Sequence, residues 1–246
     1  MSKLVLATAV VALAAGSAAA ADMGVNVPAR PNCPAAWFDG GYIGVNGGAV
    51  AWTANRTDQD AVIVDTMTLV QKKSGGVAGG QIGYNLTRCN TLFGVEIDGD
   101  WAGAKATTQF LPNTPGVNVN VTSRFNALAT ARTRAGVVLD NLLLYVTGGV
   151  AGGQFRTTWT NAVFAPPPGL LVQADISEWR WGWVAGFGTE WAWSDRVTVR
   201  SEALYVDFTD REHTVPIIPA NFTHGDSMWL ARVGINVRLG GPIAGY

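Results

Sequence analysis

The chain has 246 residues, of which 14% are charged, with a formal net charge of −1, 30 glycines and 10 tryptophans. Soluble proteins average about 25% charged residues and about 7% glycine, so this chain is poor in charge and rich in glycine. Its Lys and Arg residues form no basic block, which argues against a nucleic-acid-binding protein.

The first 21 residues have the pattern of a cleaved signal peptide. Lys3 precedes an apolar run from Leu4 to Ala15, and small residues then offer a cleavage site after Ala20 or Ala21. The apolar run is shorter than the roughly 20 residues that a helix needs to cross a bilayer. We therefore expect an exported protein, in which residues 22–37, with three prolines, form a periplasmic leader.

The remainder of the chain has no apolar run of about 18 residues that could span a membrane as a helix. The best candidate, residues 137–146, is interrupted by Asp140 and Asn141. Only helices and closed barrels satisfy every backbone polar group inside lipid. Any membrane crossing must therefore use β-strands.

Eight segments alternate between apolar and polar residues with the period of a strand. They cover residues 38–52, 75–86, 91–103, 122–139, 142–155, 178–193, 196–208 and 228–239. Three short connections, at 87–90, 140–141 and 194–195, alternate with four long ones at 53–74, 104–121, 156–177 and 209–227. Transmembrane barrels have short periplasmic turns and long external loops.

This order predicts an all-β fold, an eight-stranded antiparallel up-and-down transmembrane β-barrel over residues 38–239. Both termini are expected in the periplasm, and residues 240–246 form a short C-terminal tail. A soluble barrel of the lipocalin type is the alternative. That fold needs an apolar lumen and a polar exterior, the reverse of this pattern.

Charged residues in the predicted strands lie opposite the apolar face. A charge facing lipid at mid-bilayer costs about 2–4 kcal/mol for Arg or Lys, so these residues should face the lumen and pair there. In the fourth segment Phe125 continues the apolar face and Arg124 the polar one. An eight-stranded barrel is just wide enough for side chains to fill, so we expect a polar plug. The predicted network comprises Glu96, Asp98, Arg132, Arg134, Arg180, Glu190, Arg200, Glu202, Arg232 and Arg238.

Tryptophans lie near the ends of the predicted strands. Trp and Tyr favour the boundary between membrane and water, because part of each ring is apolar and part can hydrogen-bond. The expected interface aromatics are Trp52, Trp101, Trp179, Trp191 and Trp229, and the spacing of Trp179, Trp181 and Trp183 predicts a ribbon facing lipid.

Four segments resemble strands of a known family. They are Trp37–Gly48 in the first strand, Leu143–Ala151 in the fifth, Glu202–Asp207 in the seventh and Arg232–Asn236 in the last. The chain resembles the small outer-membrane β-barrel proteins of alphaproteobacteria, related to opacity-type barrels and to the OmpA membrane domain. The resemblance implies an eight-stranded barrel in the outer membrane of a Gram-negative cell. Such barrels often end on an aromatic residue, whereas here Leu239 is followed by a Gly/Pro tail ending at Tyr246.

Candidate site chemistry is sparse. Cys33 and Cys89 both belong at the periplasmic end in an oxidising compartment, which predicts a disulfide over two free thiols. His213 and His224 fall in the last predicted loop, where solvated histidines are the simpler interpretation and haem ligation the other. We predict no catalytic, metal or cofactor site.

The expected function is that of a non-enzymatic envelope protein that presents four surface loops. The alternative is a small pore or a surface receptor for a ligand such as haem. Expected partners are outer-membrane lipid and lipopolysaccharide, the barrel-assembly machinery, and a host or surface ligand held by the loops.

Overall fold

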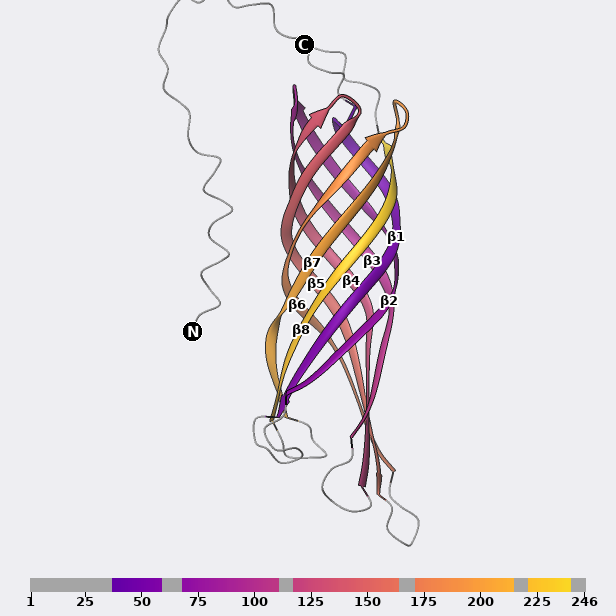
Figure 1. Cartoon of the computed structure of the whole chain (residues 1–246), viewed down its shortest axis with the longest axis vertical. Coiled ribbons are helices and arrows are strands. Elements are labelled where there is room, and N and C mark those ends of the chain that lie inside the picture. Colours follow the sequence, from indigo (N-terminus) through magenta and orange to yellow (C-terminus); the bar gives the residue numbers. More distant parts are fainter. Residues whose placement is uncertain (1–36, 59–67, 111–116, 164–170, 215–220, 240–246) are drawn as a thin grey trace, which may run out of the picture. The chain divides into compact units, whose positions relative to one another are not determined.

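The chain forms a closed, all-antiparallel barrel in which every strand pairs with its neighbours in sequence and β8 closes on β1 (Figure 1). The computed structural model describes residues 37–58, 68–110, 117–163, 171–214 and 221–239. The strands in this part are β1 (Gly40–Asp58), β2 (Thr68–Arg88), β3 (Thr91–Phe110), β4 (Val117–Leu139), β5 (Leu142–Val163), β6 (Leu171–Ala192), β7 (Val197–Thr214) and β8 (Asn221–Arg238). The predicted eight-stranded barrel is confirmed.

Several expectations lie outside the described residues: the signal peptide, nearly all of the periplasmic leader and the C-terminal tail. Among the described residues, no helix is long and apolar enough to cross a membrane.

Three tight turns join the strands at one end of the barrel, the turn end, as the sequence predicts. They lie at 89–90, 140–141 and 193–196. Cys89 and Asp140 open the two-residue turns with φ of 51° and 54°, in the left-handed region that short hairpins use. The first residues of β1 and the last of β8 lie at the same end, because Leu239 donates its backbone N–H to the carbonyl of Gly41 (2.7 Å).

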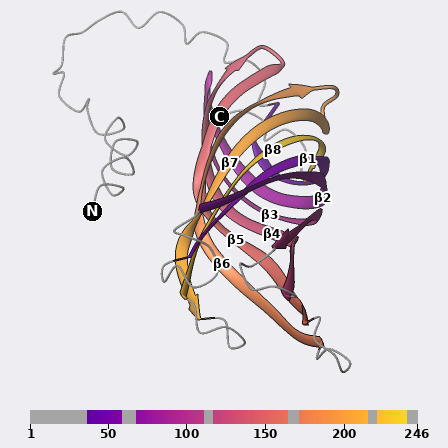
Figure 2. The same cartoon turned by 60° about the horizontal axis from the view of Figure 1, so that its bottom comes forward.

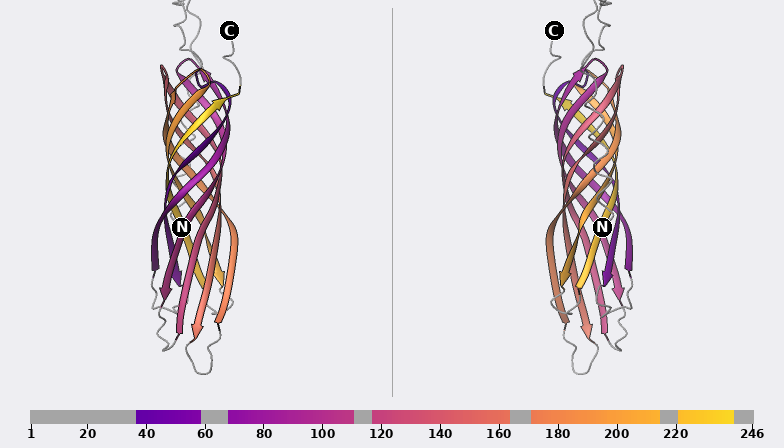
Figure 3. Two further views of the ribbon diagram at one scale, coloured as in Figure 1. Left: turned by 90° about the vertical axis from the view of Figure 1, so that its right-hand side faces the viewer. Right: turned by 90° about the vertical axis from the view of Figure 1, so that its left-hand side faces the viewer.

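The strands are longer at the opposite end, the loop end, than the sequence predicts (Figure 3). The four long connections expected at 53–74, 104–121, 156–177 and 209–227 are wrong in extent, because strands cover most of each. The residues left between strands, 59–67, 111–116, 164–170 and 215–220, lie outside the described part. Beyond the bilayer both faces of a strand can contact water, so backbone pairing continues there without the alternation that reveals a strand in lipid.

The barrel wall divides towards the loop end. In the described residues the pairing of β2 with β3 ends at Val77 and Ala102, and that of β6 with β7 ends at Gly182 and Phe208. The other pairings continue, so the sheet β7-β8-β1-β2 diverges from the sheet β3-β4-β5-β6 (Figure 2).

Inward-facing side chains form three main layers along the lumen, which corrects the expected polar plug. Along β4 the large inward residues are Val138, then Arg134 and Arg132, then Leu128 and Phe125. A turn-end cluster contains Phe38, Leu92, Val138, Leu143, Tyr145 and Ala192. A second cluster lies on the loop-end side of the charges and is called the upper cluster. It contains Val50, Trp52, Val77, Ala104, Phe125, Leu128, Ala151, Phe155, Val184, Leu204, Val206, Phe208, Met228 and Leu230. The charged layer is therefore enclosed by apolar side chains on both sides.

A β-bulge in β4 reverses one predicted face. The register of β4 against β5 shifts between Phe125 and Ala127. Phe125 is therefore buried in the lumen and Arg124 is exposed on the outer face, opposite to the strict alternation expected for this strand.

Candidate functional site: a charge network inside the barrel

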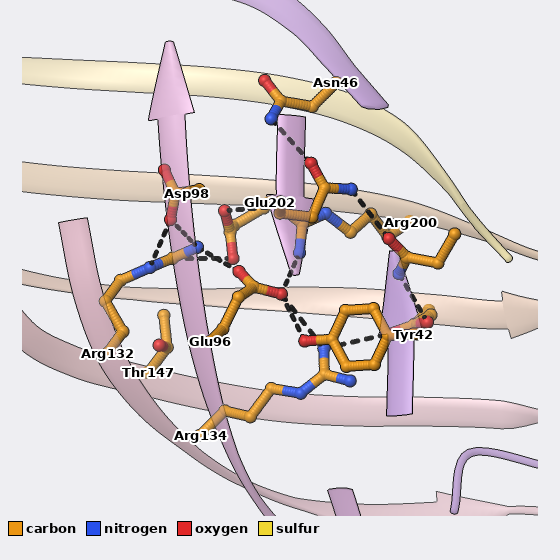
Figure 4. A network of polar contacts seen from close by, with 12 residues as sticks. Tyr42, Asn46, Glu96, Asp98, Arg132, Arg134, Thr147, Arg200 and Glu202 are labelled. Atoms are coloured by element: carbon orange, nitrogen blue, oxygen red, sulfur yellow. Dashed lines mark hydrogen bonds and ion pairs between the residues drawn. The ribbon is translucent and has the colours of Figure 1, made fainter. Parts of the chain in front are cut away.

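Charged side chains from five strands meet between the two apolar clusters (Figure 4). Each is at most 5% exposed. They are Glu96, Asp98 and Asp100 on β3, Arg132 and Arg134 on β4, Glu190 on β6, Arg200 and Glu202 on β7, and Arg232 on β8. Five carboxylates thus face four guanidinium groups across the lumen.

Arg132 is the centre of this network. Its Nη1 donates to Glu202 Oε2 (2.9 Å), its Nη2 to Asp98 Oδ2 (2.9 Å), and Nη2 also contacts Glu96. Arg132 and Glu96 are direct partners in the β3–β4 register, whereas Glu202 reaches across the lumen from β7. One guanidinium therefore connects opposite walls of the barrel.

Two further arginines complete the pairing of the same carboxylates. Arg232 donates to Asp98 Oδ1 (2.9 Å) and Glu202 Oε1 (2.6 Å) and also contacts Asp100. Arg200 donates to Glu96 Oε2 (2.6 Å), which also accepts from the hydroxyl of Tyr42 (2.5 Å). Because each carboxylate has more than one donor or a nearby guanidinium, burial of these charges is compensated.

Arg134 closes the network on the side of the turn-end cluster. It donates to Glu190 Oε2 (3.0 Å) and Asn85 Oδ1 (2.9 Å). Its guanidinium carbon lies 4.7 Å from the ring centroid of Tyr42 and 5.3 Å from that of Tyr145, within the range of cation–π attraction.

A chain of neutral amides runs beside the charges. Asn46 donates to Gln81 (2.8 Å), Gln81 to Asn236 (2.7 Å), and Asn236 to Glu190 (2.8 Å). Space for the charged layer and its amides comes from inward-facing glycines. At Gly83, for example, a Cβ would overlap the phenol of Tyr42.

The structure brings together eight of the ten residues predicted for the lumen network, and Arg180 and Arg238 lie elsewhere. Arg180 is buried beyond the upper cluster, where it contacts Asp226 and lies over the Phe155 ring, 5.3 Å from its centroid. Arg238 is half-buried at the turn end and donates to the backbone carbonyls of Asp39 (2.9 Å) and Asp195 (3.1 Å). Both face away from lipid as expected, but they lie too far along the barrel axis to reach the central carboxylates.

Sequence reasoning missed two buried carboxylates, Asp100 and Asp226. It also missed the two tyrosines whose hydroxyls donate to the network, Tyr42 to Glu96 (2.5 Å) and Tyr145 to Glu202 (3.0 Å). Asp100 continues the alternation of Glu96 and Asp98 on β3, so parity alone could have identified it. Asp226 fell within a segment expected to be a loop.

The predicted position of Trp52 at the membrane interface is wrong. Trp52 is 1% exposed, belongs to the upper cluster and donates its indole N–H to Asp226 Oδ1 (2.9 Å). It shares the parity of Tyr42 and Asn46 on β1, which place it in the lumen. The other predicted interface tryptophans, Trp101, Trp179, Trp191 and Trp229, are 43–78% exposed on the outer wall, as are Trp181 and Trp183 of the predicted ribbon, at 61% and 50%.

The remaining candidate residues are only partly described. Cys89 lies in the β2–β3 turn, whereas Cys33 lies outside the described residues, so their disulfide stays a prediction. His213 and His224 belong to β7 and β8 rather than to a loop. In the described part of the chain, no group of three His, Cys, Asp or Glu side chains is placed to hold a metal ion.

This arrangement is suited to holding the barrel walls together. Every carboxylate of the central layer is in contact with at least one guanidinium, and apolar side chains separate the layer from both ends. The strands supply an outer surface of large apolar side chains, including Ile43, Ile97, Phe187 and Ile235, each more than 40% exposed. An outer wall of this kind is stable in lipid and unfavourable in water.

Known proteins of similar sequence come from outer membranes. The 31 kDa outer-membrane immunogenic protein of Brucella melitensis biotype 1 is 29% identical over 246 residues, covering 96% of this chain and all of that protein. The 22 kDa outer membrane protein of Rhizobium leguminosarum bv. viciae is 26% identical over 163 residues, covering 65% of this chain and 66% of that protein.

Solved structures with a similar course of the chain include OprG of Pseudomonas aeruginosa, with a TM-score of 0.45 and 11% identity, over 81% of this chain and 95% of that one. AlkL in lipid bilayers gives a TM-score of 0.44 and 16% identity, over 91% of this chain and all of that one. The family profile of the outer membrane protein beta-barrel domain matches residues 7–238. With its closed eight-stranded barrel and apolar outer wall, the chain is a member of this outer-membrane β-barrel family.

Proposed function

We propose that this protein is a non-enzymatic, non-conducting barrel that contributes to the structure of the outer membrane and presents a surface at its loop end. The observation that carries the proposal is the filled lumen. Phe125, Phe155 and Phe208 meet across the upper cluster, with centroid distances of 5.2 Å and 5.0 Å from the Phe155 ring to the other two. An ion entering from the loop end would have to displace these rings before reaching the charges.

The charges themselves also favour a closed lumen. The side chains of Arg132, Asp98 and Arg232 are 0% exposed, and Asp98 is paired with both arginines. A conducting pore keeps its charged side chains hydrated so that ions can exchange along them. Here each guanidinium already has carboxylate partners from other strands, which makes the layer a cross-link between walls.

The orientation belongs to the same proposal. Barrels of this class place short turns in the periplasm and the opposite ends outside the cell. We therefore place the turn end, with both chain termini, in the periplasm and the diverging sheets of the loop end at the cell surface. The loop end is then where a host or surface ligand would bind. Outer-membrane lipid surrounds the wall, and the barrel-assembly machinery is the partner during insertion.

Planar-bilayer recording tests the closed lumen. The refolded full-length protein should leave the conductance of the bilayer unchanged, while an open porin added to the same membrane as a positive control produces steps. Regular conductance steps from the purified protein would contradict the proposal and support the alternative of a small pore.

Two further measurements address orientation and ligand binding. An epitope inserted between residues 164 and 170 should be reached by antibody on intact cells, and the same epitope between Asp140 and Asn141 should not. The reverse pattern would contradict the orientation.

Titration of the protein with haem should give no saturable spectral change. A saturable change would support the alternative of a haem receptor.

A further inference from the structure

Three cations lie side by side on the outer wall, on the loop-end side of the band of exposed apolar side chains. Lys105 on β3 is the register partner of Arg124 on β4, and Arg124 is the register partner of Arg156 on β5. All three side chains are exposed and on the outer face. We call these three residues the basic row.

The fold does not explain the basic row. Like charges that lie directly opposite each other on neighbouring strands destabilise a sheet. Asp175 on β6 relieves one of them, since Arg156 Nε donates to both of its carboxylate oxygens (3.0 Å each). In the described part of the chain no ion pair joins Lys105 or Arg124 to a carboxylate, so the row and Asp175 together carry two net positive charges.

The height of the row relates it to the membrane surface. On β3 the outward side chains Phe93, Val95, Ile97 and Trp101 are 56–78% exposed and trace the apolar band up to its aromatic edge. Lys105 follows Trp101 by four residues, about 13 Å along a strand and roughly 10 Å along a barrel axis to which the strands tilt by about 40°. On β6 Ser177 and Asp175 likewise lie on the loop-end side of the exposed Trp179. The row therefore lies at the height of lipid headgroups.

The spacing of the row suits phosphate. Neighbouring strands lie about 4.8 Å apart, so three cations side by side span about 10 Å. Arginine binds phosphate through paired N–H donors, and lysine binds it as a point charge. Asp175 accepts from Arg156 Nε on both carboxylate oxygens and so holds Arg156 in place at the edge of the row.

We propose that Lys105, Arg124 and Arg156 bind the phosphate groups of lipopolysaccharide in the outer leaflet. The proposal rests on the orientation given above, which places the loop end outside the cell, where this glycolipid lies. It commits to a lipid headgroup, because the row adjoins the apolar band and a bound phosphoglycolipid could lay its acyl chains against Trp101 and its neighbours.

The test uses purified full-length protein in nanodiscs of phosphatidylcholine, with bisphosphorylated lipid A added in increasing amounts. Binding is read from the lipid A retained per barrel after washing. The test variant is Lys105→Gln/Arg124→Gln, which leaves the Arg156–Asp175 pair intact. The matched control is Arg88→Gln/Arg196→Gln, which removes two exposed cations at the turn end.

The wild-type protein and the control should bind lipid A equally. The test variant should bind about 25-fold more weakly, since each Lys or Arg near an anionic lipid surface contributes about fivefold in affinity. Lipid A from which the phosphates have been removed should bind all three proteins alike and more weakly than phosphorylated lipid A binds the test variant, which still has Arg156.

Three results would overturn the proposal. The test variant could bind lipid A as tightly as the wild type does, or both variants could lose the same amount of lipid A binding. Inorganic phosphate alone could also bind the row with the same affinity as lipid A. None of these depends on how the barrel is oriented in cells. The epitope experiment can therefore fail while this binding persists, and binding can fail while the orientation stands.

Discussion

The central position of Arg132 makes its removal the sharpest perturbation of the lumen. In the variant Arg132→Met the guanidinium is lost, while Glu96 and Glu202 stay buried with one donor fewer each and Asp98 with two fewer. Removing one partner of a buried ion pair costs about 3–5 kcal/mol. Because Arg200 and Arg232 still contact these carboxylates, we expect the lower part of this range, about 3 kcal/mol.

Urea unfolding of the barrel in detergent micelles, followed by tryptophan fluorescence, measures this loss. With a slope of about 2 kcal/mol per molar urea, the midpoint should fall by about 1.5 M. The unboiled protein should also lose its compact, fast-running form in SDS gels at a lower temperature than the wild type. Arg88→Met is the matched control at an exposed position, and its free energy of unfolding should stay within about 0.5 kcal/mol of the wild type.

A double-mutant cycle then separates the network from simple loss of packing. Glu202→Gln combined with Arg132→Met removes one charge of each sign, so the double variant should be less destabilised than the sum of the single variants by about 1–3 kcal/mol. If Arg132→Met costs less than about 1 kcal/mol, or if the two changes are additive, the charged layer does not cross-link the walls and the reasoning is refuted.

Further predictions concern the lumen and the cysteines. Trp52→Phe deletes a buried hydrogen bond and should lower the free energy of unfolding by about 1–3 kcal/mol in the same urea assay, whereas Trp101→Phe on the outer wall should change it by less than about 0.5 kcal/mol. Gly48→Ala places a Cβ against the backbone of β8 and should prevent the compact, fast-running form from appearing in unboiled SDS gels. Gly76→Ala, whose Cβ would meet no heavy atom closer than the backbone oxygen of Gly48 at 4.0 Å, should give wild-type yields of that form. Thiol titration of unfolded protein without reductant should find no free thiol, and two reactive thiols would rule out the predicted disulfide.

The sequence predicts the strands and their faces well wherever lipid contacts one side of the wall. Between Phe93 and Trp101 on β3, for example, the outer residues must be apolar while Glu96 and Asp98 face the lumen, so the period of two is strong. The same parity places Trp52 in the lumen, whereas its position near the end of a predicted strand favours the membrane interface, and the structure follows the parity.

Other features could not be read from alternation. A bulge moves Phe125 into the lumen, and the residues around it carry no sequence pattern that would predict the bulge. Phe125 therefore joins the upper cluster, although strict alternation places it on the outer wall. Extension of the strands towards the loop end is also hidden, because the contrast between faces vanishes outside the bilayer. The pairing inside the lumen depends on which strands face each other, as Arg132 and Glu202 do, and this follows only from closure of the barrel.

Closure has a consequence for the route by which the protein reaches its final state. The charges that neutralise one another arise from β3, β4, β6, β7 and β8, so no single hairpin carries a balanced set. A hairpin that entered lipid alone would present ionised groups to hydrocarbon, at a cost of several kcal/mol for each. Stepwise insertion is therefore disfavoured, and the favoured order is one in which the walls meet in a hydrated or protein-lined space and enter the bilayer together. The layer that stabilises the finished barrel is thus also a kinetic barrier to spontaneous insertion, one that a catalyst of assembly would have to lower.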